Sequence, residues 1–132
     1  MYLSILEREK KKLFYQLAVA IASVDCVCSD EEKIMLNSYC KEMDLKYPEI
    51  DIKPIDEILQ KLNEITNIQE KKIIIFEVVG LVLADKICNA KEEEVLRCIE
   101  KVFDMDINYT NKCKELIVEY LRLQEKINTE VL

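Results

Sequence analysis

Residues that form tight turns are scarce in this chain, which has one glycine and two prolines among its 132 residues. Sandwiches and barrels of β-strands need many more, because glycine supplies positive φ and proline fixes φ at turns. Half of the residues are apolar and 34% are charged, as in an ordinary domain of this length. The sequence therefore predicts a single compact all-α domain over residues 1–132.

Capping residues and the helical spacing of apolar residues predict about six helices. The first is expected from Ser4, with Glu7 as its capping-box partner, to about Val24, and the second begins after Ser29. The stretch LKYPEIDIKP, residues 45–54, is the expected loop, because its two prolines interrupt a helix. The other four helices are expected to begin near residues 54, 68, 89 and 108.

The sequence repeats itself at an offset of 60 residues. At this offset an acid, a cysteine, a capping residue and a glutamate recur, together with the apolar positions on either side. The matched pairs are Asp25 and Asp85, Cys28 and Cys88, Ser29 and Asn89, and Glu32 and Glu92. We therefore interpret the chain as two pseudo-repeated three-helix units, over about residues 4–66 and 67–127.

The first and fourth expected helices have apolar residues around most of their circumference, which indicates burial on nearly all sides. We expect these two helices to pack together at the centre of the domain. The only glycine, Gly80, aligns with Ala20 in the repeat, and Ala18, Ala22 and Ala84 share the register. This pattern predicts a close helix crossing, at which leucine in place of Gly80 would overpack the core.

The repeated stretches read AIASVDCVCSDEE and GLVLADKICNAKEE. They resemble the signature of the TerB-like family, the tellurite-resistance type of helical domain, in which an alanine-rich helix ends in Asp-Gly-x-Ile-Ser-x-x-Glu and the motif occurs twice. The resemblance covers about residues 13–105. Cys26 and Lys86 stand where the family has glycine, and Cys28 and Cys88 stand where it has isoleucine.

The resemblance implies an accessory or scaffold role in stress-related assemblies at the inner face of the membrane. It also implies a divalent-cation site formed by acidic residues around the doubled motif. In this chain those residues are Asp25, Glu32, Asp85 and Glu92. The expected ions are Ca²⁺ or Mg²⁺, which prefer oxygen ligands.

The two repeated aspartates have a second interpretation. Asp25 and Asp85 are each expected in the last turn of a helix, where the helix dipole disfavours a negative charge by about 0.3–1 kcal/mol. A bound cation would compensate, and so would hydrogen bonds from the exposed N–H groups of the next helix. The residues leave both interpretations open, although neither stretch has the spacing of an EF-hand loop.

The six cysteines raise the question of a thiol-based site, with Cys26 and Cys28 as its first members. The start MYLSILEREKKK lacks the pattern of a secretory signal, so reduced thiols are expected. No histidine is present to complete a zinc site, and the spacing is Cys-x-Cys rather than Cys-x-x-Cys. Cys28 and Cys88 are therefore expected to be buried as small apolar residues.

Composition argues against several classes of function. The net charge of −7 disfavours contact with nucleic-acid phosphates. The longest apolar run, residues 73–84, is interrupted by Glu77 and is too short for a membrane span of roughly 20 residues. Without a histidine or a phosphate-binding glycine loop we expect no enzymatic activity, and we interpret Asp104 and Asp106 as helix caps.

These observations favour a cytoplasmic, non-enzymatic accessory or adaptor protein of a stress-response assembly. It would bind a partner protein and a divalent cation, with no nucleic-acid partner and no direct insertion into the membrane. The first alternative is a purely structural interaction domain without metal, and the second is a thiol-based metal or redox factor. Self-association into a homo-oligomer stays open at this point.

Overall fold

In the computed structural model, residues 2–22, 30–43, 54–83 and 90–132 are described. They form six α-helices preceded by a short 3₁₀ helix, and no strand occurs among them, as the sequence predicts. The elements are η1 (Leu3–Ile5), α1 (Arg8–Ala22), α2 (Asp30–Met43), α3 (Ile55–Ile65), α4 (Ile68–Val82), α5 (Ala90–Phe103) and α6 (Ile107–Val131). None of these helices is both long and apolar enough to cross a membrane.

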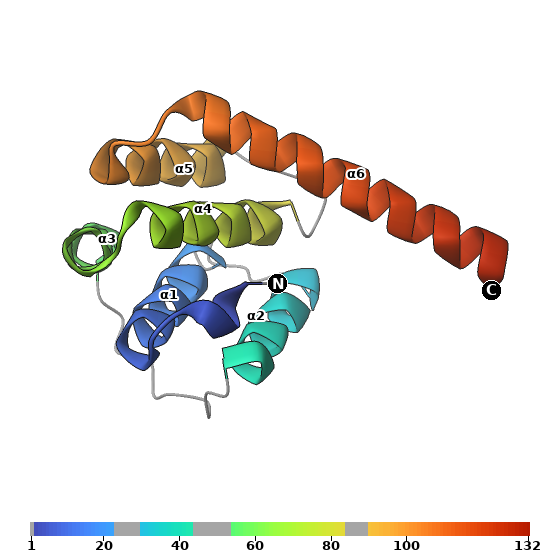
Figure 1. The fold of residues 1–132 in the computed structure, drawn as a ribbon, viewed down its shortest axis with the longest axis horizontal. Coiled ribbons are helices and arrows are strands. Elements are labelled where there is room, and N and C mark those ends of the chain that lie inside the picture. The colour runs from blue at the N-terminus through green and yellow to red at the C-terminus, as the bar shows by residue number, and fades with distance from the viewer. Residues whose placement is uncertain (1, 23–29, 44–53, 84–89) are drawn as a thin grey trace.

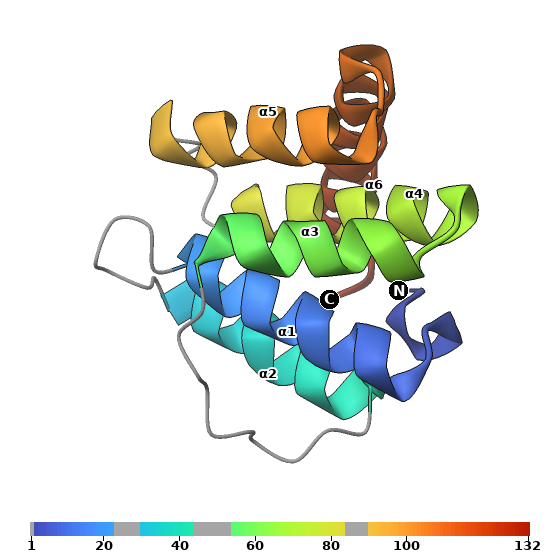
Figure 2. The ribbon, with the colours of Figure 1, turned by 90° about the vertical axis from the view of Figure 1, so that its left-hand side faces the viewer.

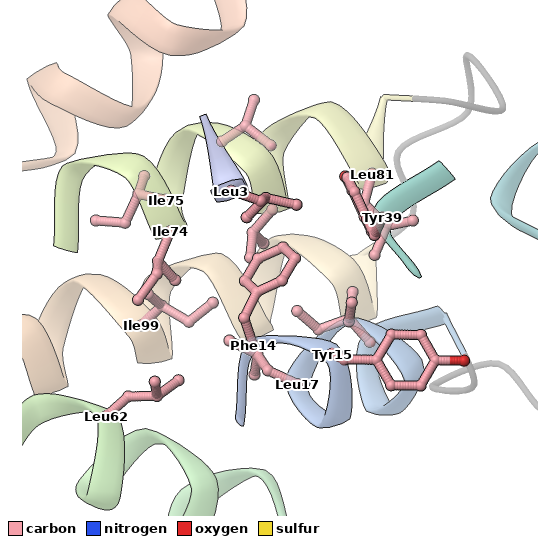
Figure 3. Packing of buried hydrophobic residues seen from close by; sticks show 14 of the residues in the cluster. Leu3, Phe14, Tyr15, Leu17, Tyr39, Leu62, Ile74, Ile75, Leu81 and Ile99 are labelled. Atoms are coloured by element: carbon pink, nitrogen blue, oxygen red, sulfur yellow. The ribbon is translucent and has the colours of Figure 1, made fainter. Parts of the chain in front are cut away.

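Helix α4 lies in the middle of the molecule (Figures 1 and 2). It packs against α1 on one side and against α5 and α6 on the other, while α3 contacts both α1 and α5. Helices α1 and α4 bury residues around most of their circumference, among them Phe14, Leu17, Ile74 and Leu81 (Figure 3). The expected packing of these two helices against each other is confirmed.

The predicted capping box at Ser4 is wrong. Ser4 lies inside η1, Leu6 is extended, and the first α-helix begins only at Arg8. The reason is tertiary: Leu3 and Leu6 are both buried, and a 3₁₀ turn places residues three apart on the same side. Burial of these two leucines therefore overrides the local preference for a serine cap.

The predicted role of Gly80 is also wrong. A Cβ atom at this position would meet Ile117 Cδ1 at 3.8 Å and Met35 Cε at 3.9 Å, which are ordinary contacts. These neighbours belong to α6 and α2, so Gly80 does not line a close crossing with α1. Ala18 and Ala22 of α1 are buried as expected.

The ends of the later helices follow their sequence signals. At the start of α4, the Asn67 side chain accepts a hydrogen bond from the Glu70 N–H at 2.8 Å, and the Glu70 carboxylate accepts one from the Asn67 N–H at 3.1 Å. Asp106 caps α6 by accepting a hydrogen bond from the Asn108 N–H at 2.8 Å, so its interpretation as a cap is confirmed. Asp104, at the turn before α6, has a positive φ of 53°.

The helix bounds follow a simple relation. Helices α1 and α4 are offset by 60 residues at both ends, and so are α2 and α5. The relation ends at the third helix, because α3 has 11 residues whereas α6 has 25.

Candidate protein-binding surface

Two adjoining hollows lie along α6. The first, which we call the acidic groove, has a volume of about 840 Å³ and lies between α2, α4 and α6. Its lining comprises Ile34, Met35, Ser38, Tyr39, Glu42, Phe76, Glu77, Gly80, Ile117, Tyr120, Leu121, Gln124, Glu125 and Asn128. The second, the apolar hollow, has a volume of about 560 Å³ and lies between η1, α4 and α6. Phe76, Ile117 and Tyr120 belong to both.

The acidic groove combines an apolar floor with negative charge. Every charged residue that lines it is a glutamate: Glu42 from α2, Glu77 from α4 and Glu125 from α6. Met35 lies on the floor, and its flexible thioether side chain adapts to differently shaped ligands. A groove of this kind suits an apolar side chain that is flanked by positive charges.

The floor of the acidic groove is fixed by buried hydrogen bonds. Glu77 is only 5% exposed, and its carboxylate accepts a hydrogen bond from the Tyr2 N–H at 3.0 Å. The Tyr39 hydroxyl donates to the Glu77 backbone carbonyl at 2.9 Å, and the Tyr39 ring stacks edge-on against Phe14. Burial, followed by the charge of Glu77, raises the pKa of Tyr39 well above its ordinary value. Tyr39 therefore stays a neutral hydrogen-bond donor at physiological pH.

Gly80 gives the acidic groove its depth. With no side chain at this position, the nearest atoms across the groove are the tips of Ile117 and Met35. A methyl group would fit with ordinary contacts, whereas a large side chain would occupy the groove itself. The glycine that the sequence assigns to a buried crossing thus belongs to the candidate binding surface.

The apolar hollow has a different character. Its only charged lining residue is Lys72, whose ammonium lies 5.7 Å from the centre of the Tyr109 ring. The Tyr109 hydroxyl donates a hydrogen bond to the Lys72 carbonyl at 2.8 Å, and burial raises the pKa of Tyr109. Tyr2 and Phe76 stack edge to face on the opposite wall, with ring centroids 6.2 Å apart.

The C-terminal half of α6 extends beyond the other helices (Figure 1). In α6 only Thr110, Cys113 and Ile117 are buried, and all three lie in its first half. Large apolar residues nevertheless continue along the exposed helix. They are Leu116, Val118, Tyr120, Leu121, Leu123, Ile127 and Val131.

The structure reaches only part of the predicted cation site. Asp25 and Asp85 lie outside the described residues, and for Glu32 only the backbone is described, in the first turn of α2. Glu92 lies in the first turn of α5 and is 3% exposed. Within the described parts of the chain, no three cysteine, aspartate or glutamate side chains gather closely enough to hold a metal ion. The four-residue site stays a prediction.

The thiol site is likewise untested, because Cys26, Cys28 and Cys88 lie outside the described residues. Of the cysteines that the structure describes, Cys40 and Cys113 are buried and Cys98 is partly exposed, and these three thiols are free. Burial raises the pKa of Cys113, while a hydrogen bond with Tyr109 opposes the shift. A buried thiol with a raised pKa is a weak nucleophile.

Neither hollow is among the sequence predictions. One signal for them is present, since apolar residues recur on the last helix beyond the end of the proposed repeat, at Val131. Comparison with known proteins adds no assignment: no protein-family model, no curated protein and no solved structure matches this chain. The TerB-like resemblance therefore stays a prediction.

Proposed function

We propose that this protein is a non-enzymatic adaptor whose acidic groove binds an amphipathic helix of a partner protein. The partner helix would place apolar anchors on the groove floor and lysine or arginine residues near the rim. Binding of an amphipathic helix in an apolar groove is a recurrent mode of recognition, read through residues three and four apart. The single observation that carries the proposal is the lining of the groove, where an apolar floor meets charged residues that are all acidic.

The charge pattern determines which partner fits. A neutral apolar helix would leave the carboxylates of Glu42 and Glu125 without compensation as water is displaced, which costs free energy. A basic helix gains from the same carboxylates and is also steered toward them by the net charge of −7. The groove therefore favours basic over acidic helices with the same apolar face.

The wider role follows from the sequence resemblance. The common offset of 60 residues between α1 and α4, and between α2 and α5, supports the duplicated TerB-like architecture. With that architecture comes the proposal that the adaptor serves a stress-response assembly at the inner face of the membrane. Binding of Ca²⁺ or Mg²⁺ at Asp25, Glu32, Asp85 and Glu92 remains part of this proposal.

A pair of synthetic helical peptides tests the groove. Both carry the same leucine face, and one has lysine and the other glutamate on its polar face. We expect fluorescence anisotropy to show binding of the lysine peptide only. In the double variant Glu42→Lys/Glu125→Lys the affinity should fall at least about tenfold, because two attractive contacts become repulsive.

The matched control is Glu57→Lys/Glu64→Lys, which makes the same change of net charge on the exposed face of α3. This control should bind the lysine peptide within about twofold of the wild type, apart from the loss of long-range steering. Equal loss in both double variants would reduce the interaction to non-specific charge attraction. Equal binding of the two peptides by the wild type would contradict the proposed partner chemistry.

The cation component has its own test, which is isothermal titration of the full chain with Ca²⁺, Mg²⁺ and Mn²⁺. We expect heat of binding with at least one ion, and its loss in Asp25→Asn/Asp85→Asn. No heat at millimolar metal would remove the cation from the proposal and would leave an interaction domain without metal. Labelling of Cys26 in the native chain tests the thiol alternative, which requires a reactive thiolate at this position.

A further inference from the structure

Four exposed residues form one apolar stripe along the last helix. Leu116, Tyr120, Leu123 and Ile127 are separated by four, three and four residues, which is the spacing of the seam positions in a heptad repeat. Each is between 48% and 56% exposed. The stripe spans about 16 Å at the helical rise of 1.5 Å per residue.

The stripe lies beside the buried side of α6 rather than opposite to it. At roughly 100° per residue, the stripe is rotated toward the apolar hollow from the side that carries Cys113 and Ile117. Two of its members, Leu116 and Tyr120, line that hollow. Leu123 and Ile127 line neither hollow and belong to the half of α6 that extends past the other helices (Figure 1).

Two opposite charges flank the stripe on its outer side. Glu119 and Lys126 are seven residues apart, so they occupy the same heptad position on two successive heptads. When two such helices run antiparallel with Leu116 opposite Ile127 of the second copy, Tyr120 lies opposite Leu123 of the second copy. In that register each Glu119 faces a Lys126 of the second copy, and twofold symmetry makes two such pairs.

A parallel arrangement gains no such pairing. In that case Glu119 would face Gln124 of the second copy, so the two charges would contribute nothing to the choice of partner. The parallel arrangement would also place both globular bodies at the same end of the helix pair. Antiparallel helices separate the bodies, each beside the extended half of the other copy's α6.

We propose that a second copy of this chain binds to the stripe, forming a twofold dimer with antiparallel α6 helices. Its last turns after Ile127 would then run along Leu116 and Tyr109, over the apolar hollow. The hollow wall of Tyr2, Ile5 and Phe76 would be covered with them. This contact adds to a seam that would be marginal alone, and it leaves the lining of the acidic groove unchanged except at the shared Tyr120 and its neighbours.

The oligomeric state tests the proposal directly. Sedimentation velocity of the full chain should show a species of twice 15.5 kDa at micromolar concentration. Leu123→Asp places a charge in the seam and should abolish that species. The control is Val118→Asp, because Val118 is 44% exposed on the opposite side of the same helix, and this variant should dimerise like the wild type.

Reversal of the flanking charges tests the register. Glu119→Lys makes both facing pairs positive and should raise the dimer dissociation constant at least about tenfold. The double variant Glu119→Lys/Lys126→Glu restores two opposite-charge pairs and should restore the dimer. Circular dichroism of each variant should match the wild type, which separates lost association from lost folding.

Several results would overturn the dimer. They are a wild-type chain that stays monomeric up to its solubility limit, a dimer that survives Leu123→Asp, and a dimer lost equally in Val118→Asp. A dimer insensitive to Glu119→Lys would overturn the antiparallel register. Binding of the lysine peptide by the monomeric variant Leu123→Asp would leave the acidic groove intact, so the two proposals fail separately.

Discussion

The two halves of α6 have similar sequences and different surroundings. Residues 107–117 lie on α4 and bury Thr110, Cys113 and Ile117, and the Lys114 ammonium also pairs with Glu93 of α5. Residues 118–131 are exposed throughout, although leucine, isoleucine and tyrosine recur among them. Apolar spacing on a helix thus shows that a face is suited to burial. It does not show whether the covering surface belongs to the same chain.

The comparison assigns different free energies to the same side chain. Ile117→Ala should lower the free energy of unfolding by about 2–5 kcal/mol, because it leaves a cavity between α6 and α4. Ile127→Ala, ten residues further along, should change it by less than about 0.5 kcal/mol at concentrations where the chain is monomeric. Urea denaturation of both variants measures the difference. Similar losses in the two would mean that the second half of α6 is also packed within the chain.

The start of α6 should matter less than its buried side. Asp106→Ala removes the side-chain acceptor for the Asn108 N–H and should cost about 1 kcal/mol. Asp106→Asn keeps an acceptor at the same place and should cost only a fraction of that. Thermal melts of the pair would check this, and equal stability of the alanine variant and the wild type would deny the cap a role in seating the helix.

The smallest effect concerns the helix on which α6 lies. Lys10 Nζ donates to both carboxylate oxygens of Glu70 at the start of α4, at 3.0 and 2.8 Å. Partial burial works against ionisation of Glu70, but the hydrogen bonds from Lys10 and Asn67 outweigh it and lower the pKa of Glu70 below 4.5. The hydrogen bond to Glu70 raises the pKa of Lys10 above 10.5.

The signs give opposite pH limits for this pair. A lowered carboxyl pKa contributes stability above the unfolded-state value, and that stability is lost as the pH falls from 4.5 through the lowered pKa. A raised ammonium pKa contributes stability below 10.5, lost as the pH rises through the raised value. Glu70→Gln should therefore flatten the decline in stability below pH 4.5, whereas Glu64→Gln in α3 should leave it unchanged. Urea midpoints measured at several pH values distinguish the two.

Much of the fold follows from local signals. The starts of α2, α4 and α5 lie within one residue of their expected positions, because Ser29, Asn67 and Asn89 mark them and apolar spacing continues behind them. The cap predicted at Asp106 is observed for the same reason. These features depend on residues within one turn of each other, which a sequence displays directly.

The errors arise where distant parts of the chain decide. Ser4 has a capping partner in the sequence, but the burial of Leu3 and Leu6 fixes a 3₁₀ turn instead. Gly80 aligns with an alanine in a buried register, yet its neighbours come from α2 and α6, and it forms part of a groove. The acidic groove depends on three helices meeting, so no local pattern announces it. The predicted cation residues Asp25 and Asp85 lie outside the described residues.

Hydrogen exchange measured at two protein concentrations tests the central contrast within α6 most directly. Amides of residues 107–117 should be protected at both concentrations, because their helix is packed on α4. Amides of residues 118–131 should be protected at high concentration and should exchange much faster on dilution, as the second copy dissociates. Protection of the second half that does not change with concentration, whether high or low throughout, would contradict the account.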